Sequence, residues 1–329
     1  MGEYSNFINA KVLITGGLGF IGSNLAHRLV GLKAKVTLVD SLIPEYGGNL
    51  FNITGIEDKV RVDISDVRDA HSMHYLIEGQ DYLFNLAGQT SHLDSMSDPY
   101  TDLEINCKAQ LSILEVCRNY NPHIRIVFAS TRQIYGKPQY LPVDEKHLLR
   151  PVDVNGINKM AGEWYHILYN NTYDIRACAL RLTNTYGPRM RIKDARQTFV
   201  GIWIRNLIEG KTFEVWGGEQ LRDFTYVDDV IDAMLLAAKD EKACGQIFNL
   251  GGNEVISLEE LAKLLLELNG RGKYLIKEFP GDRKKIDIGD YYSDFTQIKK
   301  VLGWEPKISL SDGLLSTLNF YQKNIKNYT

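Results

Sequence analysis

The sequence predicts an α/β protein built on a doubly wound parallel sheet, with a smaller mixed α/β domain beside it. Between residues 11 and 181, short β-branched runs alternate with longer amphipathic segments, as in parallel strands joined by crossover helices. A glycine-rich turn follows the first of these runs and leads into a helical segment. Right-handed crossovers wind such units into an open sheet that helices cover on both faces.

The elements follow one another in a regular order. The predicted strands span residues 11–15, 35–40, 60–64, 82–86, 124–130 and 175–181, and the helices between them include 21–31, 67–79, 100–119 and 154–171. After residue 181 the chain becomes rich in Gly, Pro and Arg. A helix at 227–239 and a strand at 246–250 again have the character of sheet elements, and an amphipathic helix follows about residue 309. We therefore assign residues 1–182 to the sheet domain, with 224–250 returning to it, and residues 183–223 and 251–329 to the smaller domain.

The composition is that of an ordinary globular protein. Of the 329 residues, 44% are hydrophobic and 24% charged, and the formal charge of −3 gives no basic field to attract nucleic acid or anionic lipid. No apolar stretch approaches the roughly 20 residues that span a bilayer, and the N-terminus has no apolar signal run, so we expect a cytoplasmic protein. The four cysteines form no Cys-x-x-Cys pair, which argues against a zinc site or any other metal centre.

The glycine-rich turn has the spacing of a dinucleotide-binding fingerprint. Gly16 and Gly19 allow a tight turn and a close approach of backbone to pyrophosphate, and Gly22 allows the following helix, predicted at 21–31, to pack closely on the sheet. The N-terminus of that helix offers unpaired N–H groups to phosphate. Asp40 ends the second strand, where its carboxylate can accept hydrogen bonds from ribose hydroxyls and would repel the extra phosphate of NADP. The fold is therefore expected to be of the Rossmann type, with NAD as cofactor.

Several further motifs follow one another along nearly the whole chain. They are Asp63-Ile64, Asn85-Leu86-Ala87-Gly88, Asn106, Phe128-Ala-Ser-Thr131, Arg181-Leu-Thr-Asn184-Thr-Tyr-Gly-Pro-Arg189, Arg222-Asp-Phe-Thr-Tyr-Val-Asp-Asp229 and Leu302-Gly-Trp-Glu-Pro306. Together they resemble the extended short-chain dehydrogenase/reductase family, in its nucleotide-sugar epimerase and dehydratase branch. The resemblance implies a bound NAD that withdraws hydride from a sugar hydroxyl carbon, usually C4. It also implies cofactor contacts from Gly16, Gly19, Phe20, Ile21, Gly22, Asp40, Asp63, Ile64, Leu86, Ala87, Gly88, Asn106 and Lys159.

One position departs from the family pattern. The family uses Ser or Thr with a Tyr-x-x-x-Lys pair for acid/base chemistry; Thr131 and Lys159 match, but Asn155 stands in the tyrosine position. An amide can orient a hydroxyl but does not exchange a proton at neutral pH. Three explanations follow: another group supplies the base, the reaction needs none there, or the protein binds nucleotide sugars without converting them. Lys159 and His92 are the two candidates for a replacement base.

The residues after Thr131 bear on the type of reaction. Dehydratases of the branch carry an acidic pair there, whereas this chain has Arg132 and Gln133, which disfavours the usual 4,6-dehydratase chemistry. The first hypothesis is an NAD-dependent nucleotide-sugar epimerase with Thr131, Asn155 and Lys159 at its centre. The alternatives are a dehydratase with rearranged acid/base residues and a silent NAD and nucleotide-sugar binding protein.

Charged and polar side chains are expected to hold the nucleoside diphosphate and the sugar. A diphosphate needs backbone N–H groups and Arg or Lys side chains in a cleft with little water. The candidate substrate-binding residues are His92, Arg132, Asn184, Arg222 and Arg283. By family resemblance the protein should also form a homodimer through the helices at 100–119 and 154–171.

Overall fold

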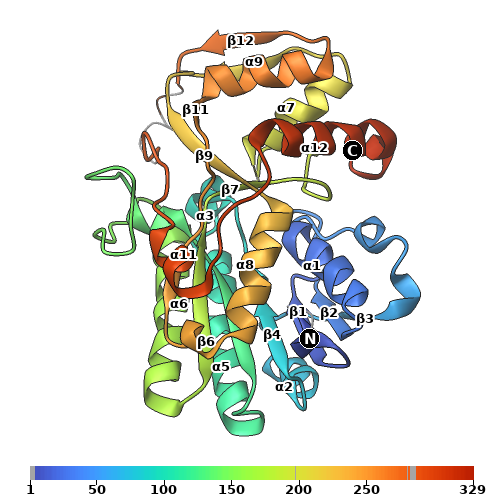
Figure 1. Cartoon of the computed structure of the whole chain (residues 1–329), viewed down its shortest axis with the longest axis vertical. Helices are drawn as coiled ribbons and strands as arrows, with labels where there is room; N and C mark the ends of the chain where they lie inside the picture. The colour runs from blue at the N-terminus through green and yellow to red at the C-terminus, as the bar shows by residue number, and fades with distance from the viewer. Residues whose placement is uncertain (1–3, 197, 280, 282–286) are drawn as a thin grey trace.

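The computed structural model describes residues 4–196, 198–279, 281 and 287–329. A larger lobe contains the sheet and a smaller lobe sits above it in Figure 1, with the N-terminus in the larger lobe and the C-terminus in the smaller one. In the ranges described, none of the helices combines the length and the apolar character needed to cross a membrane.

The larger lobe is built on one parallel sheet of seven strands. The strands are β1 (Lys11–Thr15), β2 (Lys35–Asp40), β3 (Val60–Ile64), β4 (Tyr82–Asn85), β5 (Arg125–Thr131), β6 (Arg176–Leu182) and β10 (Ile247–Asn249), in the order β10-β6-β5-β4-β1-β2-β3. The chain moves outward from β1 to β3, returns to β4 beside β1, and then moves outward in the other direction. A crevice opens at such a switch point, at the carboxyl ends of the strands. The predicted fold class is confirmed.

Helices cover both faces of the sheet because alternate strand residues point to opposite sides. In β1, Val12 and Ile14 join the core formed with α1 (Phe20–Gly31) and α8 (Val227–Lys239), and Leu13 joins the core on the other face. That second core is completed by α2 (Ala70–Ile77), α5 (Ala109–Tyr120) and α6 (Val154–Tyr173). Inner strands such as β1 and β4 are therefore largely apolar, since both of their faces are buried, whereas the edge strand β3 is only partly buried.

The helix predicted over residues 100–119 is divided. It consists of α4 (Pro99–Leu103), a π-helical turn η4 (Glu104–Lys108) and α5, and a short α3 (His92–Ser97) that was not predicted precedes α4. Asp98 ends α3 and caps α4 by accepting the Thr101 N–H, and Pro99 occupies the first turn of α4. Helix α2 is shorter than its predicted range of 67–79, because Asp69 caps it by accepting the His71 N–H. Capping by side chains therefore sets the first residues of α2 and α4.

The smaller lobe has two small sheets and several helices. Strands β7 (Asn184–Tyr186), β9 (Leu221–Tyr226) and β11 (Val255–Ser257) form a mixed three-stranded sheet, and β8 (Phe213–Trp216) pairs with β12 (Tyr274–Lys277). Its helices are α7 (Phe199–Ile208), α9 (Leu258–Asn269) and α12 (Leu310–Asn324), while α11 (Thr296–Leu302) packs near β10. Between β9 and β10 the chain returns to the larger lobe as α8, so it passes between the lobes more than once. The two lobes face each other across the carboxyl edge of the sheet (Figure 1).

Candidate functional site

A cavity of about 1040 Å³ extends along the carboxyl edge of the sheet and between the lobes. It begins at the glycine turn before α1 and passes the ends of β2, β4 and β5. Its far end lies among aromatic side chains of the smaller lobe, including Trp203, Trp216 and Phe279. A volume at the upper limit of single-ligand pockets leaves room for two elongated ligands placed end to end.

The glycine turn fits a dinucleotide pyrophosphate. Gly16 has a φ of +66°, and a Cβ there would lie 3.1 Å from the Ala87 backbone. A Cβ on Gly22 would lie 2.3 Å from the Gly16 carbonyl oxygen, so only glycine allows the helix to start this close to the turn. Gly16, Gly19, Phe20, Ile21 and Gly22 all line the cavity. The first turn of α1 therefore directs its N–H groups toward a bound phosphate.

Asp40 lies on the cavity wall at the end of β2, as predicted. Its carboxylate accepts the Leu18 N–H at 3.0 Å and the Leu42 N–H at 2.9 Å, which fixes its orientation. Burial raises the pKa of Asp40, and these two N–H groups partly oppose that shift. Asp63 and Ile64 lie farther out: Ser65, Asp66 and Val67 line the cavity beyond β3, while Ile64 is exposed and Asp63 accepts a hydrogen bond from Ser65.

Lys159 and Gly88 meet at the floor of the cavity. A Cβ on Gly88 would lie 2.9 Å from both Lys159 Nζ and Asn106 Oδ1. Lys159 Nζ donates to the Ala129 carbonyl oxygen at 3.1 Å and lies over the Phe128 ring, and burial lowers its pKa to about 8. Leu86 and Ala87 line the cavity beside Gly88, whereas Asn106 lies behind the wall and donates to the Gln89 carbonyl oxygen. The residues present at this floor fit a nicotinamide ribose.

Thr131 ends β5 on the cavity wall, and its Oγ1 accepts the Gln133 N–H at 3.2 Å. A buried network supports it from behind. Ser130 donates to Glu163 at 2.6 Å, and Arg181 forms two hydrogen bonds with the same carboxylate. The position of Thr131 is thus fixed by its own turn and by a buried ion pair.

Asn155 lies on the cavity wall, and both protons of its amide nitrogen are engaged. Nδ2 donates to the Gln89 carbonyl oxygen at 2.8 Å and to Asp102 Oδ2 at 3.0 Å. Asn158 donates to the other oxygen of Asp102 at 2.8 Å, and Asp102 has no exposed surface. Since an amide nitrogen has two protons, only the carbonyl oxygen of Asn155 remains for a ligand. Asn155 can therefore accept a hydrogen bond from a sugar hydroxyl but cannot donate one.

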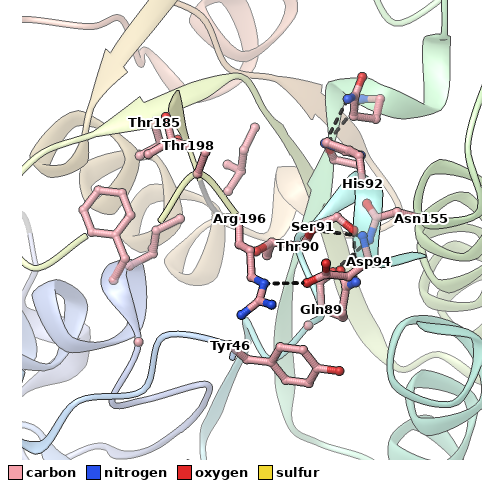
Figure 2. A pocket seen from close by; sticks show the side chains of 18 of the residues that line it. Tyr46, Gln89, Thr90, Ser91, His92, Asp94, Asn155, Thr185, Arg196 and Thr198 are labelled. Atoms are coloured by element: carbon pink, nitrogen blue, oxygen red, sulfur yellow. Dashed lines mark hydrogen bonds and ion pairs between the residues drawn. The ribbon is translucent and has the colours of Figure 1, made fainter. Parts of the chain in front are cut away.

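His92 is the first residue of α3 and lies beside Asn155 on the cavity wall (Figure 2). Its Nδ1 lies 2.9 Å from Asp153 Oδ2, and its Nε2 lies 2.9 Å from Gln133 Nε2. Neither Asp153 nor Gln133 was among the predicted site residues. An Asp directly before the helix predicted at residue 154 is typical of a helix cap, and Asp153 does cap α6 by accepting the Gly156 N–H. Nothing in the sequence places its second oxygen against His92.

The structure brings some of the predicted substrate-binding residues together. Arg132 donates to Asn184 Oδ1 at 3.0 Å and lies over the Tyr291 ring, while its Nη1 has no hydrogen-bond partner among the described residues. Arg222 lies close by, and burial, with the charge of Arg132 second, lowers its pKa to about 10. All three polar residues line the cavity with His92. The remaining candidate, Arg283, lies outside the described residues.

Two further features complete the cavity. Arg196 and Asp94 form an ion pair at 3.0 Å between the loop before α7 and helix α3, and Tyr46 lies nearby (Figure 2). At the far end, the rings of Trp216 and Phe279 lie 6.3 Å apart and both line the cavity. An aromatic end of this kind suits a flat nucleotide base.

Known proteins match this chain in sequence and in structure. The chain is 31% identical over 314 residues to a UDP-glucose 4-epimerase of Mycolicibacterium smegmatis, covering 95% of this chain and 98% of the relative. The crystal structure of a UDP-glucose 4-epimerase with UDP-glucose from Thermotoga maritima is 30% identical, with a TM-score of 0.86 and coverage of 95% and 99%. A dTDP-glucose 4,6-dehydratase from Streptomyces venezuelae, solved with NAD bound, is 25% identical, with a TM-score of 0.87 and coverage of 96% and 98%.

A family model gives the same result as these individual matches. The model of the NAD dependent epimerase/dehydratase family matches residues 12–251, which contain the glycine turn, Asp40, Thr131 and Lys159. The cofactor of this family is NAD, in agreement with the fit of the glycine turn and of the floor at Gly88. The chain belongs to the NAD dependent epimerase/dehydratase family.

Proposed function

We propose that this protein is an NAD-dependent epimerase that acts on the sugar of a nucleoside diphosphate sugar, at a hydroxyl carbon that we take to be C4. The observation that carries this proposal is the continuity of one cavity. It connects the glycine turn, the Thr131 and Lys159 pair, the arginines Arg132 and Arg222, and the aromatic end at Trp216. Bound NAD supplies a hydride acceptor that can also return the hydride.

The residues of the chain then have distinct tasks. The turn at Gly16 and the carboxylate of Asp40 would hold the pyrophosphate and the adenosine ribose of the cofactor. Lys159 would hold the nicotinamide ribose, and the Thr131 hydroxyl would orient the reacting sugar hydroxyl. Arg222 and Arg132 would neutralise the diphosphate, because guanidinium groups pair well with phosphate oxygens.

The turn after Thr131 favours epimerisation over dehydration. Elimination across C5 and C6 requires an acid to protonate the leaving hydroxyl, and the positions next to Thr131 hold Arg132 and Gln133. Arg132 is held by Asn184 and by stacking on Tyr291, so it contributes a fixed positive charge and no exchangeable proton at neutral pH. We therefore place the dehydratase reaction second.

We also propose a homodimer. Large apolar side chains are exposed on α3, α4 and α6, which pack against one another; they include Leu93, Met96, Tyr100, Leu103, Ile157, Trp164 and Leu168. On α6 the spacing of seven and then four residues from Ile157 through Trp164 to Leu168 places these three on one helix face. An apolar patch of this kind on a soluble lobe is typical of a protein interface.

A panel of UDP-, dTDP-, GDP- and CDP-sugars, incubated with the protein and NAD and followed by NMR, tests the function. A new epimer from one sugar is the expected result. Thr131→Val is the matched variant, since it removes the hydroxyl but keeps the shape, and it should lose most of the turnover while retaining NAD. A 4-keto-6-deoxy product would identify a dehydratase instead. Tight binding of a sugar nucleotide without conversion of any panel member would contradict the proposal in favour of a silent binding protein.

A further inference from the structure

We propose that His92, paired with Asp153, accepts and returns the proton of the reacting sugar hydroxyl, the task for which this chain has no tyrosine at position 155. The inference rests on the proposed epimerase function and specifies its acid/base group. The His92 side chain is 35% exposed and lines the cavity, so a ligand can reach it.

His92 contacts two segments, the turn after Thr131 and the start of α6 before Asn155. Its Nε2 contacts Gln133, whose backbone N–H is bound by Thr131 Oγ1. Its Nδ1 contacts Asp153, two residues before Asn155. The His92 carbonyl oxygen also accepts the Ser95 hydroxyl, which in turn accepts the Asn155 N–H. The imidazole is thus held by contacts to Gln133 and Asp153, each two residues from Thr131 or Asn155, and the proposal places a hydroxyl held by Thr131 within its reach.

The Asp153 carboxylate is available to stabilise a charged imidazole. Its side chain is 1% exposed; Oδ1 accepts the Gly156 N–H, and Oδ2 has no hydrogen-bond partner among the described residues while it faces His92 Nδ1 at 2.9 Å. A buried carboxylate beside Nδ1 orients the ring and favours the imidazolium that forms when Nε2 takes a proton.

The other charged groups around His92 have partners of their own. Asp94, on the same helix, is paired with Arg196, and Asp102 on α4 accepts the amides of Asn155 and Asn158. Lys159 on α6 donates to the Ala129 carbonyl oxygen. Asp153 is therefore the carboxylate that acts directly on His92.

The other candidate bases fit less well. Both amide protons of Asn155 are used, and an amide does not exchange protons near neutral pH. Lys159 lies against Gly88 and Ala129, at the floor where the cofactor ribose would bind. Tyr46 also lines the cavity, but burial raises its pKa, which is the opposite of what a tyrosinate base requires.

The proton and electron balance is complete with NAD as the oxidant. The O–H bond of the sugar breaks and its proton moves to His92 Nε2, while the hydride of the same carbon moves to the nicotinamide and leaves a ketone. On return, the imidazolium gives the proton back to the carbonyl oxygen as the hydride adds to the other face. The Gln133 carboxamide contacts Nε2 in this structure, and the sugar hydroxyl would take over that contact.

His92→Gln, Asp153→Asn and the control His71→Gln test the inference in the full-length protein with NAD and the sugar nucleotide that the panel identifies. His71 is exposed on α2, outside the cavity lining. His92→Gln should lower kcat by on the order of 100-fold or more, with the affinities for NAD and for free UDP, measured by calorimetry, unchanged. Asp153→Asn keeps a good helix cap and should lower kcat by less. His71→Gln should behave as the wild type.

Two readouts separate proton transfer from a structural role. In the wild type, kcat/KM should rise with pH along an acidic limb, because the base must be neutral to accept the proton. That limb should disappear in His92→Gln and move to lower pH in Asp153→Asn, because the imidazolium loses its carboxylate partner. Free imidazole should restore turnover to His92→Ala, and the restored rate should rise with the neutral fraction of imidazole.

The possible failures are distinct. Near wild-type kcat and an unchanged acidic limb in His92→Gln would overturn the assignment of His92 and leave the epimerase function in place. Loss of UDP binding in the variant without imidazole rescue would show a structural role and would also overturn it. If His92→Gln does not fold, an unchanged acidic limb in Asp153→Asn decides against the pair. A wild-type protein that converts no sugar removes the proposed function, and this inference with it.

Discussion

Lys159 is a buried lysine that has no carboxylate in hydrogen-bond contact among the described residues, so its charge lowers the stability of the protein without ligands. In the part of the chain that the structure describes, its ammonium group donates to the Ala129 carbonyl oxygen, and burial lowers its pKa from 10.5 to about 8. The folded state therefore holds the proton more weakly than the unfolded chain does. Below about pH 8 the charged lysine lowers the free energy of unfolding by its full amount. This destabilisation disappears as the pH rises from about 8 toward 10.5, because the folded protein then loses the proton before the unfolded chain does.

Lys159→Met should stabilise the ligand-free protein near pH 7 by about 1–3 kcal/mol, because it removes a poorly paired buried charge while keeping an apolar stem. The difference from the wild type should shrink at about pH 10. Urea unfolding at the two pH values measures both effects. A methionine variant that is less stable than the wild type at neutral pH would show that the lysine is better solvated than its surroundings indicate.

Asp40→Ala should weaken NAD binding by about 10-fold or more, since hydrogen bonds to a charged acceptor contribute roughly 1.5–3 kcal/mol. Titration calorimetry with NAD and, as a comparison, with NADP measures this change. The affinity for NADP should fall less or rise, because the repelling carboxylate is gone. Equal NAD affinity in the variant and the wild type would place Asp40 away from the ribose.

At the scale of residues, the sequence identifies a site residue when the residues next to it along the chain form a recognisable motif. Gly16, Gly22 and Asp40 belong to one strand-turn-helix unit and a strand end, so spacing alone places them at the cavity. Asp153 and Gln133 could not be identified in this way. Their importance comes from contacts with His92, which is 61 and 41 residues away in the sequence. Tertiary packing creates those contacts: α3 packs against α6 near Asp153, and the turn after β5 brings Gln133 to His92.

At the scale of elements, helix α6 connects the wall of the cavity to the buried side chains of the sheet. Glu163 on α6 forms two hydrogen bonds with Arg181 on β6 and accepts a third from Ser130 on β5. Both charged side chains are almost completely buried. The same helix carries Asn155, Asn158 and Lys159. A change in this ion pair should therefore be felt at Thr131, the residue after Ser130.

Glu163→Gln should destabilise the protein by about 3–5 kcal/mol, because it leaves Arg181 as a buried charge without its counter-ion. The double variant Glu163→Leu with Arg181→Met should be less destabilised than the single one, since both charges are then removed. Chemical unfolding of the two variants and the wild type measures the differences. A single variant with wild-type stability would show that water or Tyr135 compensates Arg181.

The sequence predicts elements well where their boundaries depend on local signals. Strands β1, β2 and β3 and helix α8 begin and end at the predicted residues. Helix α3 was missed, although Ser91 followed by Asp94 is a readable capping pattern, because six residues are too few to show helical periodicity. The π-helical turn at Glu104–Lys108 has no sequence signal that separates it from an ordinary helix.

At the scale of the whole molecule, the doubly wound topology could be predicted because parallel strands buried on both faces leave a strong apolar rhythm. The two small sheets of the second lobe could not, since strands of three or four residues such as β7, β8 and β11 carry too little pattern. The exact division of the chain between the lobes stays a prediction.

The proposed dimer gives a test at the same scale. Trp164→Glu should convert the dimer to a monomer, because it places a charge in the centre of the apolar face formed by α3, α4 and α6. Leu275→Glu is the matched control, an equally exposed apolar residue on β12 in the other lobe. Gel filtration with light scattering measures the mass of each. A wild-type protein that is a monomer at all concentrations would rule out the dimer.

The amide contacts of Asn155 also restrict how the protein could evolve. Asp102 is a fully buried carboxylate whose two oxygens are bound by Asn155 and Asn158. Replacing Asn155 by tyrosine would remove one of these donors and leave a buried acceptor unsatisfied, at a cost of roughly 1–3 kcal/mol or more. A Tyr-x-x-x-Lys pair therefore does not form here by one substitution without disturbing Asp102. Asp102 therefore favours asparagine at position 155, although Asp102 itself does not need to contact the substrate.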